Sequence, residues 1–348
     1  MAAAKVILDR VQTDARLVLF GNTLSMGLAT LHESLPDADA LQAQADAALY
    51  AAKRLGRNTI AEYDELRDGM WLLSPSKVQN LRQLIAARAI NVVFQPIWDV
   101  RRCRILAYEA LSRPDAAYGF RGPQDAFDLA ERIGRSHELD AVCREAALAG
   151  ARDLPARQLL FINVSPQSLD HGRFDAGSFV AAVRSAGMTP DRIVIEITER
   201  AVTQIEVVIA AALDLREHGF RLALDDTGAG NSGLQMLSRL PLDFVKIDRE
   251  VVERALVDDK ARGVIAGIIA IANATHAYVI AEGIETTEML EFVCGSIAQA
   301  ANAAPRIHGV QGYLLRRPRE TFLAADETED SAALLREFTL GLKQAAGL

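Results

Sequence analysis

Short apolar runs rich in β-branched and aromatic residues recur along most of the chain. Eight of them follow one another between residues 92 and 315: VVFQPIW, ILAYEAL, LLFINV, RIVIEIT, RLALDD, DFVKID, YVIAEG and VQGYLL. Most are separated by stretches long enough for a helix, such as VIAAALDLREHG between the fourth and fifth runs. Alternating strands and helices are typical of a parallel α/β sheet, and eight strands over about 230 residues fit a closed (β/α)8 barrel.

The first two apolar runs are joined only by the segment DVRRCR. This segment is too short for a crossover helix, which a parallel connection requires, so we expect a hairpin at this point. The pattern therefore predicts a TIM-like (β/α)8 barrel that contains one antiparallel strand.

The part of the chain before the barrel has a different pattern. It contains an alanine-rich helical segment, the strand-like run NTLSMGLATL and a second helix, ADAALYAAKRLGRNTIAEY, that ends near Gly56. A mixed segment with a Ser-Pro pair then leads into another helix. We expect a small N-terminal α+β region over residues 1–63, a linker helix region over 64–80, the barrel over 81–325 and a C-terminal helix over 326–348.

Polar residues fall at or near the carboxyl ends of the apolar runs. These residues are Glu109, Asn163, Glu196, Asp225, Asp226, Lys246, Asp248 and Glu282. In a barrel the carboxyl ends of the strands converge on one face, which is where active sites are built. Any one of these acids can instead cap a following helix or pair with an arginine. As a set they would repel one another at a cost of several kcal/mol unless cations compensate, so their convergence implies bound metal.

The residue types at these strand ends favour a hard cation. No histidine or cysteine lies among them, and ligands that offer only oxygen select Mg²⁺, Mn²⁺ or Ca²⁺. Adjacent Asp225 and Asp226 can serve two ions about 4 Å apart, the arrangement used for in-line attack on phosphodiesters. Lys246 can steady a developing negative charge or an attacking hydroxide, or it can form a structural ion pair with Asp248 or Glu282.

Composition and charge limit the function classes. The 348 residues are 50% hydrophobic and 24% charged, which is ordinary for a globular protein, and the net charge of -8 argues against broad binding to nucleic-acid polymers. The three cysteines show no C-x-x-C spacing, which fits a reducing cytoplasm. We find no signal peptide, and Asn273 and His276 interrupt the long apolar run from Gly263. We read that run as a buried helix and strand, not a membrane span.

A formal G-x-G-x-x-G lies in the segment LALDDTGAGNSGL, from Gly228 to Gly233. Such a motif can bind the pyrophosphate of a dinucleotide at the start of a helix. Here it follows the fifth predicted strand instead of the first, and a pyrophosphate would face Asp225 and Asp226. We therefore regard the match as accidental.

Taken together, the motifs resemble those of the EAL-domain cyclic di-GMP phosphodiesterases. The matching segments, in order from about Leu81 to Pro318, are FQPIWDV, YEALSRP, FINVSP, IEITE, LALDD with a glycine-rich loop, VKID, AEGIET and QGYLL. This resemblance implies hydrolysis of cyclic di-GMP to pGpG in bacterial second-messenger signalling, with Mg²⁺ or Mn²⁺ at a two-metal site. It also implies a homodimer formed through the EAL domain.

The resemblance assigns roles to individual residues. Glu109, Asn163, Glu196 and Asp225 match the ligands of one metal, and Asp225 and Asp226 match those shared with the second. Lys246 matches the lysine that orients the nucleophilic water. Glu282 matches an acid that acts as general base or as a water-mediated metal partner.

Further positions match residues with substrate-binding or supporting roles. Gln95 and Arg113 match substrate contacts, and Arg113 offers a bidentate guanidinium to a phosphate. Glu199 resembles the residue that anchors the loop after the fifth strand of the family's barrel, and Glu285 has a comparable supporting position. Gln311 matches a late polar residue near the water and the metal. It lies 29 positions after Glu282, which is more than is usual in the family, because of the insertion IAQAANAAPRIH.

Two departures from the family pattern keep alternatives open. Thr227, Ala229, Asn231 and Gly233 replace residues of the usual DDFGTGYSSL loop, so a catalytically weak or silent cyclic di-GMP receptor is the alternative to an enzyme. Every matched catalytic position nevertheless carries the expected residue. TLSMGLATL and ADAALYAAKRLGRN resemble the last strand and final helix of a GGDEF cyclase domain, but the glycine-glycine-acid signature is absent. We expect a spacer there and no cyclase activity.

Overall fold

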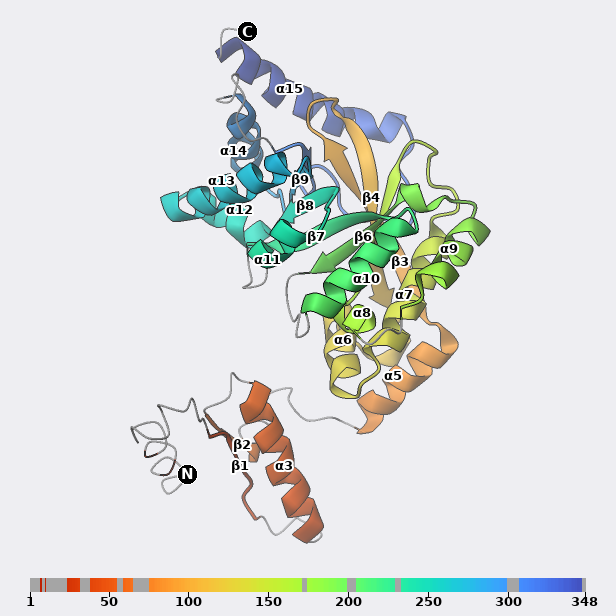
Figure 1. The fold of residues 1–348 in the computed structure, drawn as a ribbon, viewed down its shortest axis with the longest axis vertical. Helices are drawn as coiled ribbons and strands as arrows, with labels where there is room; N and C mark the ends of the chain where they lie inside the picture. The colour runs from red at the N-terminus through yellow and green to blue at the C-terminus, as the bar shows by residue number, and fades with distance from the viewer. Residues whose placement is uncertain are drawn as a thin grey trace. The chain divides into compact units, whose positions relative to one another are not determined.

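The structure is a computed structural model. It describes residues 7, 10, 24–31, 38–54, 59–64, 75–170, 174–198, 205–228, 233–298 and 307–345 (Figure 1). The chain divides into two compact units, Met1–Val78 and Gln79–Leu348. The finer division expected from the sequence, with boundaries near residues 63, 80 and 325, stays a prediction.

The described part of the first unit is a small β-α-β arrangement. Strand β1 (Met26–Leu28) pairs in parallel with β2 (Ile60–Glu62), and helix α3 (Ala38–Arg54) connects them. The helix packs closely because Gly27 of β1 has no side chain: a Cβ there would lie 2.0 Å from the backbone nitrogen of Leu49. The buried core of this unit consists of small residues, Ala48, Ala51, Ala52 and Ala61. The resemblance of these segments to a GGDEF domain stays a prediction.

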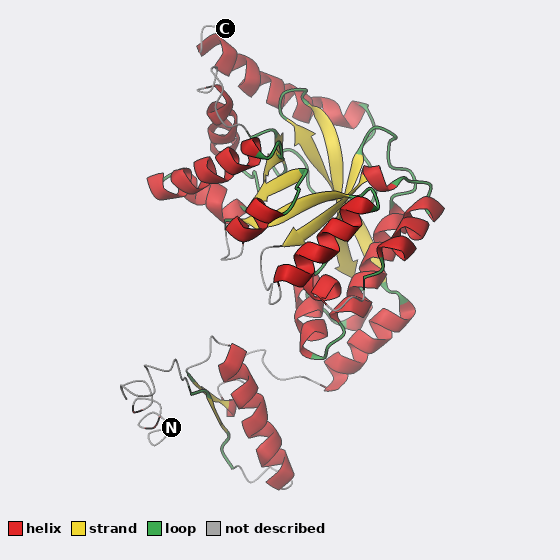
Figure 2. Cartoon of the chain, in the orientation of Figure 1, coloured by secondary structure: helices red, strands yellow, loops and turns green. Residues whose placement is uncertain are grey.

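Eight strands of the second unit close into a barrel (Figure 2). They are β3 (Ile90–Asp99), β4 (Arg104–Pro114), β5 (Leu159–Asn163), β6 (Ile193–Thr198), β7 (Arg221–Thr227), β8 (Phe244–Ile247), β9 (Tyr278–Ala281) and β10 (Gly309–Val310). Around the barrel the order is β10-β3-β4-β5-β6-β7-β8-β9. Each strand falls within or overlaps one of the eight apolar runs, so the predicted barrel is confirmed.

Strand β3 runs antiparallel to both of its neighbours, β4 and β10, while the remaining pairs are parallel. The turn between β3 and β4 contains Cys103 in a left-handed conformation, with φ of 48°. The predicted hairpin and single antiparallel strand are therefore confirmed. The pairing places Gln95 of β3 directly opposite Glu109 of β4.

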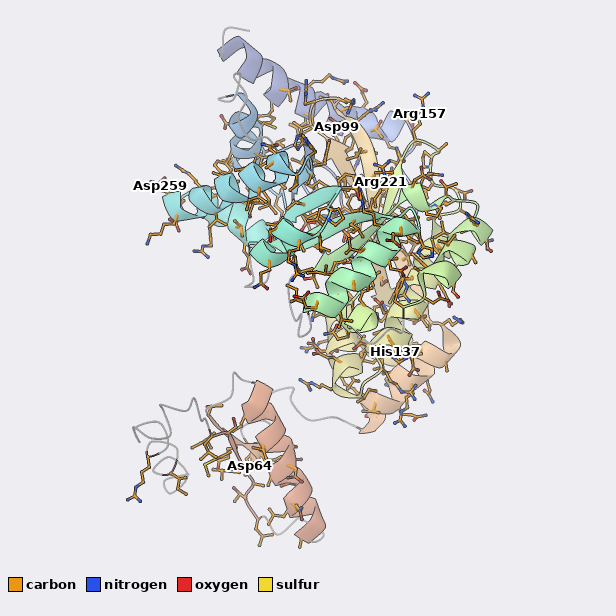
Figure 3. All side chains as sticks on the ribbon, in the orientation of Figure 1. Asp64, Asp99, His137, Arg157, Arg221 and Asp259 are labelled. Carbon is orange, nitrogen blue, oxygen red and sulfur yellow. The ribbon has the colours of Figure 1, made fainter. Side chains whose placement is uncertain are left out.

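Helices cover the outside of the barrel (Figure 2). They are α5 (Pro75–Ala87), α6 (Pro123–Arg132), α7 (Ser136–Gly150), α8 (Pro166–Asp170), α9 (Ala176–Ser185), α10 (Ile205–Glu217), α11 (Gly233–Arg239), α12 (Arg249–Ala255), α13 (Asp259–Ala274), α14 (Thr287–Ala298) and α15 (Glu329–Ala345). Outward-facing strand residues such as Tyr108, Ile195 and Leu224 form one apolar core with buried residues of the helices from α7 to α15. Charged side chains lie on the outer surface, where Asp259 at the start of α13 is 93% exposed (Figure 3).

The long apolar run from Gly263 forms most of α13 and then β9, as expected from its interruption by Asn273 and His276. One face of α13 is buried against the barrel through residues such as Ile265 and Ile269. In the part of the chain that the structure describes, no helix has the length and apolar character needed to span a membrane.

Candidate active site

One layer of side chains inside the barrel is apolar. It consists of Ile97, Ala107, Phe161, Val194, Ala223, Phe244 and Ile280. Successive strand residues point to opposite faces, so the next inward-facing residue lies two positions along each strand. Two positions toward the mouth, the layer becomes polar: Gln95, Glu109, Asn163, Glu196, Asp225, Lys246 and Glu282. The alternation of the strands thus brings these predicted site residues to one level.

Lys246 of β8 lies at the centre of this polar layer. Its side chain is 1% exposed, and its Nζ lies 3.3 Å from Glu109 Oε2, 3.1 Å from Asp225 Oδ1 and 2.6 Å from Glu282 Oε1. It also forms an ion pair with Glu196. The sequence left open that Lys246 forms a structural ion pair with Glu282. This ion pair is present, as part of a larger cluster.

Asp248 has a different role from the residues of the polar layer. Its carboxylate accepts a hydrogen bond from the backbone N–H of Glu250 at 2.7 Å and caps the N-terminus of α12. The helix-capping role that any single strand-end acid can have is therefore the correct interpretation for this residue.

Two amide side chains connect the acids. Asn163 Nδ2 donates to Glu109 Oε1 at 3.1 Å and to Glu196 Oε2 at 3.0 Å. When Glu109 and Glu196 are ionised they only accept hydrogen bonds, so the amide nitrogen of Asn163 is the end that faces them and its oxygen is left for another partner. Gln311 Nε2 donates to Glu109 Oε2 at 2.7 Å, and its own Oε1 is buried without a hydrogen-bond partner. Gln311 thus joins the cluster despite the insertion that precedes it.

The charges in this cluster are unbalanced. Burial and the neighbouring Glu109 raise the pKa of Glu196 well above its ordinary value, against the opposing effect of Lys246. Burial also raises the pKa of Glu282, again opposed by Lys246. Burial alone would lower the pKa of Lys246, but the surrounding carboxylates outweigh it and the net effect is a pKa raised well above the ordinary value. Lys246 therefore stays charged, and the acids need more positive charge to ionise fully.

Strand β7 presents two adjacent acids to the mouth. Neighbouring residues of a regular strand point to opposite faces. The register of β7 against β8 shifts between Leu224 and Thr227, and Asp226 has a left-handed backbone with φ of 54°. Carboxylate oxygens of Asp225, Asp226 and Glu282 consequently lie within 4.8 Å of one another, close enough to hold one metal ion.

The donor set fits a divalent hard cation. Four carboxylates, those of Glu109, Glu196, Asp225 and Glu282, contact a single lysine, and an oxygen of Asp226 lies within 4.8 Å of oxygens of Asp225 and Glu282. The Asn163 oxygen and the unpartnered Gln311 oxygen add neutral donors. An all-oxygen set with an excess of negative charge is the environment that Mg²⁺ and Mn²⁺ prefer.

The other predicted residues lie around this centre. Gln95 Nε2 donates to the backbone oxygen of Arg316 at 3.4 Å, and Arg113 donates to the backbone oxygen of Ser112 at 2.9 Å. Glu285 forms an ion pair with Arg249 at 2.5 Å. The predicted loop anchor Glu199, together with Ala229 and Asn231 of the altered loop, lies outside the described residues.

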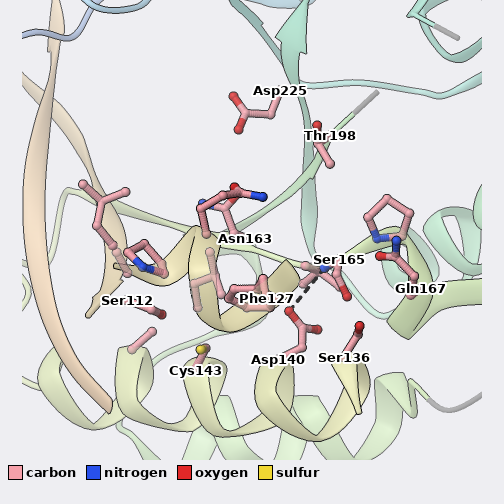
Figure 4. Close-up of a pocket in the computed structure, with 18 of the residues that line it drawn as sticks. Ser112, Phe127, Ser136, Asp140, Cys143, Asn163, Ser165, Gln167, Thr198 and Asp225 are labelled. Carbon is pink, nitrogen blue, oxygen red and sulfur yellow. Dashed lines mark hydrogen bonds between the residues drawn. The ribbon is translucent and has the colours of Figure 1, made fainter. Parts of the chain in front are cut away.

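A cavity of about 530 Å³ opens beside the acids (Figure 4). Its lining includes Arg113 and four acid-cluster residues, Glu109, Asn163, Asp225 and Asp226, with helices α6 and α7 supplying much of the opposite wall. The sequence had not singled out Ser112, Phe127, Asp140 and Thr198, which also line it. Thr198 could have been found from the sequence, because it lies two positions beyond Glu196 on β6 and so faces the same side of the strand. In the structure its Oγ1 lies 3.5 Å from Asp226 Oδ2.

A model of the EAL domain family matches residues 78–318. The chain belongs to this family. The Glu109-Ala110-Leu111 triplet lies on β4, where Glu109 reaches the centre of the acid cluster. The family predicted from the ordered motifs is therefore confirmed.

Curated relatives and solved structures agree with this assignment. An uncharacterized signaling protein of Caulobacter vibrioides is 31% identical, over 86% of this chain and 36% of that protein. The cyclic di-GMP phosphodiesterase NbdA of Pseudomonas aeruginosa is 29% identical, over 89% of this chain and 39% of that protein. The chain thus spans less than half the length of either. Klebsiella pneumoniae BlrP1, solved as a manganese and cyclic di-GMP complex, is 29% identical with a TM-score of 0.57, over 66% of this chain and 56% of that one.

Proposed function

We propose that this EAL-domain chain hydrolyses cyclic di-GMP to the linear dinucleotide pGpG with Mg²⁺ or Mn²⁺, in bacterial second-messenger signalling. The observation that carries the proposal is the cluster of four carboxylates that contact Lys246 at the mouth of the barrel, with Asp226 close to two of them. Relatives named as cyclic di-GMP phosphodiesterases, and a solved relative that holds manganese and cyclic di-GMP, support this substrate and these metals. We further propose a cytoplasmic homodimer formed through the EAL domain.

The cluster residues would hold two ions. Glu109, Asn163, Glu196 and Asp225 would bind one ion, and Asp225 and Asp226 would share the second, with Glu282 close enough to contribute. Bound Mg²⁺ or Mn²⁺ would neutralise phosphate charge and lower the pKa of a bound water. The Asn163 amide would offer its oxygen, because its nitrogen already donates to Glu109 and Glu196.

The remaining chemistry belongs to side chains of this chain. Lys246 would orient the attacking water and steady its negative charge, since its ammonium is fixed by four carboxylates. Glu282 would take the proton of that water, and burial makes it a stronger base than an exposed glutamate by raising its pKa. Arg113, which lines the cavity beside the acids, would bind a phosphate of the dinucleotide. Gln95 of the polar layer would also contact the substrate.

We assign supporting roles to three further residues. Glu199 would anchor the loop after β7, the fifth of the apolar runs, and Glu285 would hold the segment after β9 through its ion pair with Arg249. Gln311 would act next to the water and the metal, since its Nε2 bonds Glu109 and its Oε1 remains available.

The test is direct turnover. Purified chain is incubated with cyclic di-GMP and Mn²⁺, and the products are separated by chromatography. We expect pGpG, no product after addition of EDTA, and loss of product in Glu109→Gln. A matched control is Glu206→Gln, which removes an exposed carboxylate paired with Arg239 and should leave the rate unchanged.

The alternative is a weak or silent receptor for cyclic di-GMP. The observation that favours it is the altered loop, where Thr227 follows the two aspartates in place of the family's phenylalanine. Binding of cyclic di-GMP without any pGpG, in the presence of saturating Mn²⁺, would establish the receptor and refute the enzyme.

A further inference from the structure

The cavity wall opposite the strands contains a buried acid, Asp140. Its side chain comes from α7 and points toward the loop after β5, where Ser165 lies (Figure 4). Asp140 is 2% exposed, and its helix neighbours Leu139, Val142 and Cys143 are also buried. A carboxylate in such surroundings costs free energy unless both of its oxygens are satisfied, so its partners indicate what it does.

Both oxygens of Asp140 have specific partners. Oδ1 accepts a hydrogen bond from the backbone N–H of Ser165 at 3.2 Å. Oδ2 forms an ion pair with Arg144, one helical turn further along α7. The Arg144 guanidinium is itself held, because it lies 4.6 Å from the centre of the Phe174 ring and its side chain is only 12% exposed. Asp140 is thus a fixed acceptor aimed at Ser165.

Ser165 controls the direction of the chain just after Asn163. The N–H of Val164 bonds to the oxygen of Glu196 at 3.0 Å and continues the strand pairing. Pro166 has no N–H to donate and begins α8. The N–H of Ser165 therefore lies between the sheet and the next helix, and Asp140 supplies the bond that links it to α7.

We propose that Asp140 is a positioning residue for the metal site. By holding Ser165 it fixes the end of β5, so that the Asn163 amide keeps its nitrogen on Glu109 and Glu196 and its oxygen toward the metal. Arg144 supports this contact from the far side of Asp140. The inference rests on the proposed function, which makes Asn163 a metal ligand. Outer partners that orient ligands in this way typically change metal affinity by about 10- to 100-fold when they are lost.

The test measures Mn²⁺ affinity and thermal stability in parallel. Asp140→Ala alone leaves Arg144 without its partner and should lose stability for that reason. The double variant Asp140→Ala/Arg144→Ala removes both charges together. We expect this double variant to melt closer to wild type than the single variant, yet to bind Mn²⁺ about 10-fold or more weakly, as measured by electron paramagnetic resonance of free Mn²⁺.

A matched control is present at the opposite end of the barrel. Asp243 precedes β8, accepts the backbone N–H of Leu222 at 3.0 Å and pairs with Arg216, so it makes the same two kinds of contact far from the acids. Asp243→Ala/Arg216→Ala should change the melting temperature but not the Mn²⁺ affinity. Turnover gives a further readout: kcat at a fixed Mn²⁺ concentration should fall in the Asp140 double variant and recover as Mn²⁺ is raised.

The possible outcomes separate this inference from the proposed function. Wild-type Mn²⁺ affinity in the Asp140 double variant would overturn the positioning role, whatever the turnover. Mn²⁺ binding by the wild type without pGpG formation would refute the phosphodiesterase. The positioning role would still be supported in that case if the double variant bound Mn²⁺ more weakly than the wild type. A wild-type chain that binds no Mn²⁺ would refute both.

Discussion

At the scale of the residue, Lys246 combines near-complete burial with contacts to four carboxylates. In the variant Lys246→Met, no cation would lie between the carboxylates of Glu109, Glu196 and Asp225. We expect the metal-free variant to lose about 3–5 kcal/mol of free energy of unfolding, because breaking a buried ion pair leaves uncompensated charge. Mn²⁺ should restore part of it, since a cation would again be present. Turnover should fall by at least about 100-fold through the loss of water orientation.

The measurements for Lys246→Met are thermal melting in EDTA and in Mn²⁺, together with the rate of pGpG release. Lys260→Met is the control, because Lys260 is an exposed lysine on α13. If Lys246→Met melted like the control in EDTA, the lysine would not be what holds the acids together.

The thiols give a second prediction at this scale. Burial raises the pKa of both Cys143 and Cys294 to about 12, whereas Cys103 is only half-buried. A thiol with such a pKa is about one part in ten thousand thiolate at pH 8, so the two buried thiols should resist alkylation until the pH approaches their pKa. Mass spectrometry should show one labelled cysteine in the native protein at pH 8 and three after unfolding. Rapid labelling of Cys143 or Cys294 in the native protein would contradict their burial.

The individual residues show what a sequence can reveal. Glu109, Glu196 and Lys246 were predictable, because a polar residue in an apolar strand run stands out and the alternation of the strand tells which face it shares. Asp140 was missed because it lies on a helix, where one acid among apolar neighbours gives no indication of which loop it contacts. Its role depends on a distance of 3.2 Å between segments 25 positions apart.

At the scale of the element, the strand order and the hairpin followed from apolar runs and connection lengths. The geometry of β7 could not be predicted from these patterns. The sequence placed Asp225 and Asp226 next to each other, but a regular strand would point them to opposite faces. The shifted register and the positive φ of Asp226 bring both to the mouth, and they depend on how β7 pairs with β8. A local pattern does not contain that information.

The connection from β10 gives a prediction about an element. Gly312 follows Gln311, and a Cβ at Gly312 would lie 2.0 Å from the backbone oxygen of Ile284. The two segments are also bonded, because the N–H of Ile284 donates to the oxygen of Gln311 at 3.0 Å. Gly312→Ala must therefore push the segments apart and move Gln311 away from Glu109. We expect a loss of about 1–3 kcal/mol of stability and a lower kcat.

Thermal melting and pGpG release would measure the effect of Gly312→Ala. Gly263→Ala is a suitable comparison, because this glycine lies in α13 and a Cβ there would meet nothing within 4 Å. That variant should be neutral or slightly more stable, since alanine favours a helix more than glycine does. Equal stability of the two variants would mean that the close approach at Gly312 is not rigid.

At the scale of the whole molecule, the described residues of the two units form separate apolar clusters. The first unit has a core of alanines, Ala48, Ala51, Ala52 and Ala61, whereas the barrel and its helices form much larger apolar clusters. The acids, the lysine and the cavity residues all belong to the second unit, Gln79–Leu348. The spacer role predicted for the first unit therefore requires that the barrel fold and bind metal without it.

A shortened chain beginning at Pro75, the first residue of α5, tests this requirement and leaves that helix intact. We expect it to melt cooperatively at a temperature close to that of the full chain, because the apolar clusters of the barrel include none of the described residues that the deletion removes. Mn²⁺ affinity and the rate of pGpG release should stay within about threefold of the full chain, a difference of less than 1 kcal/mol in binding or activation free energy. An aggregated or inactive product would show that the first unit stabilises or completes the barrel, and a much faster one would show that it restrains the active site.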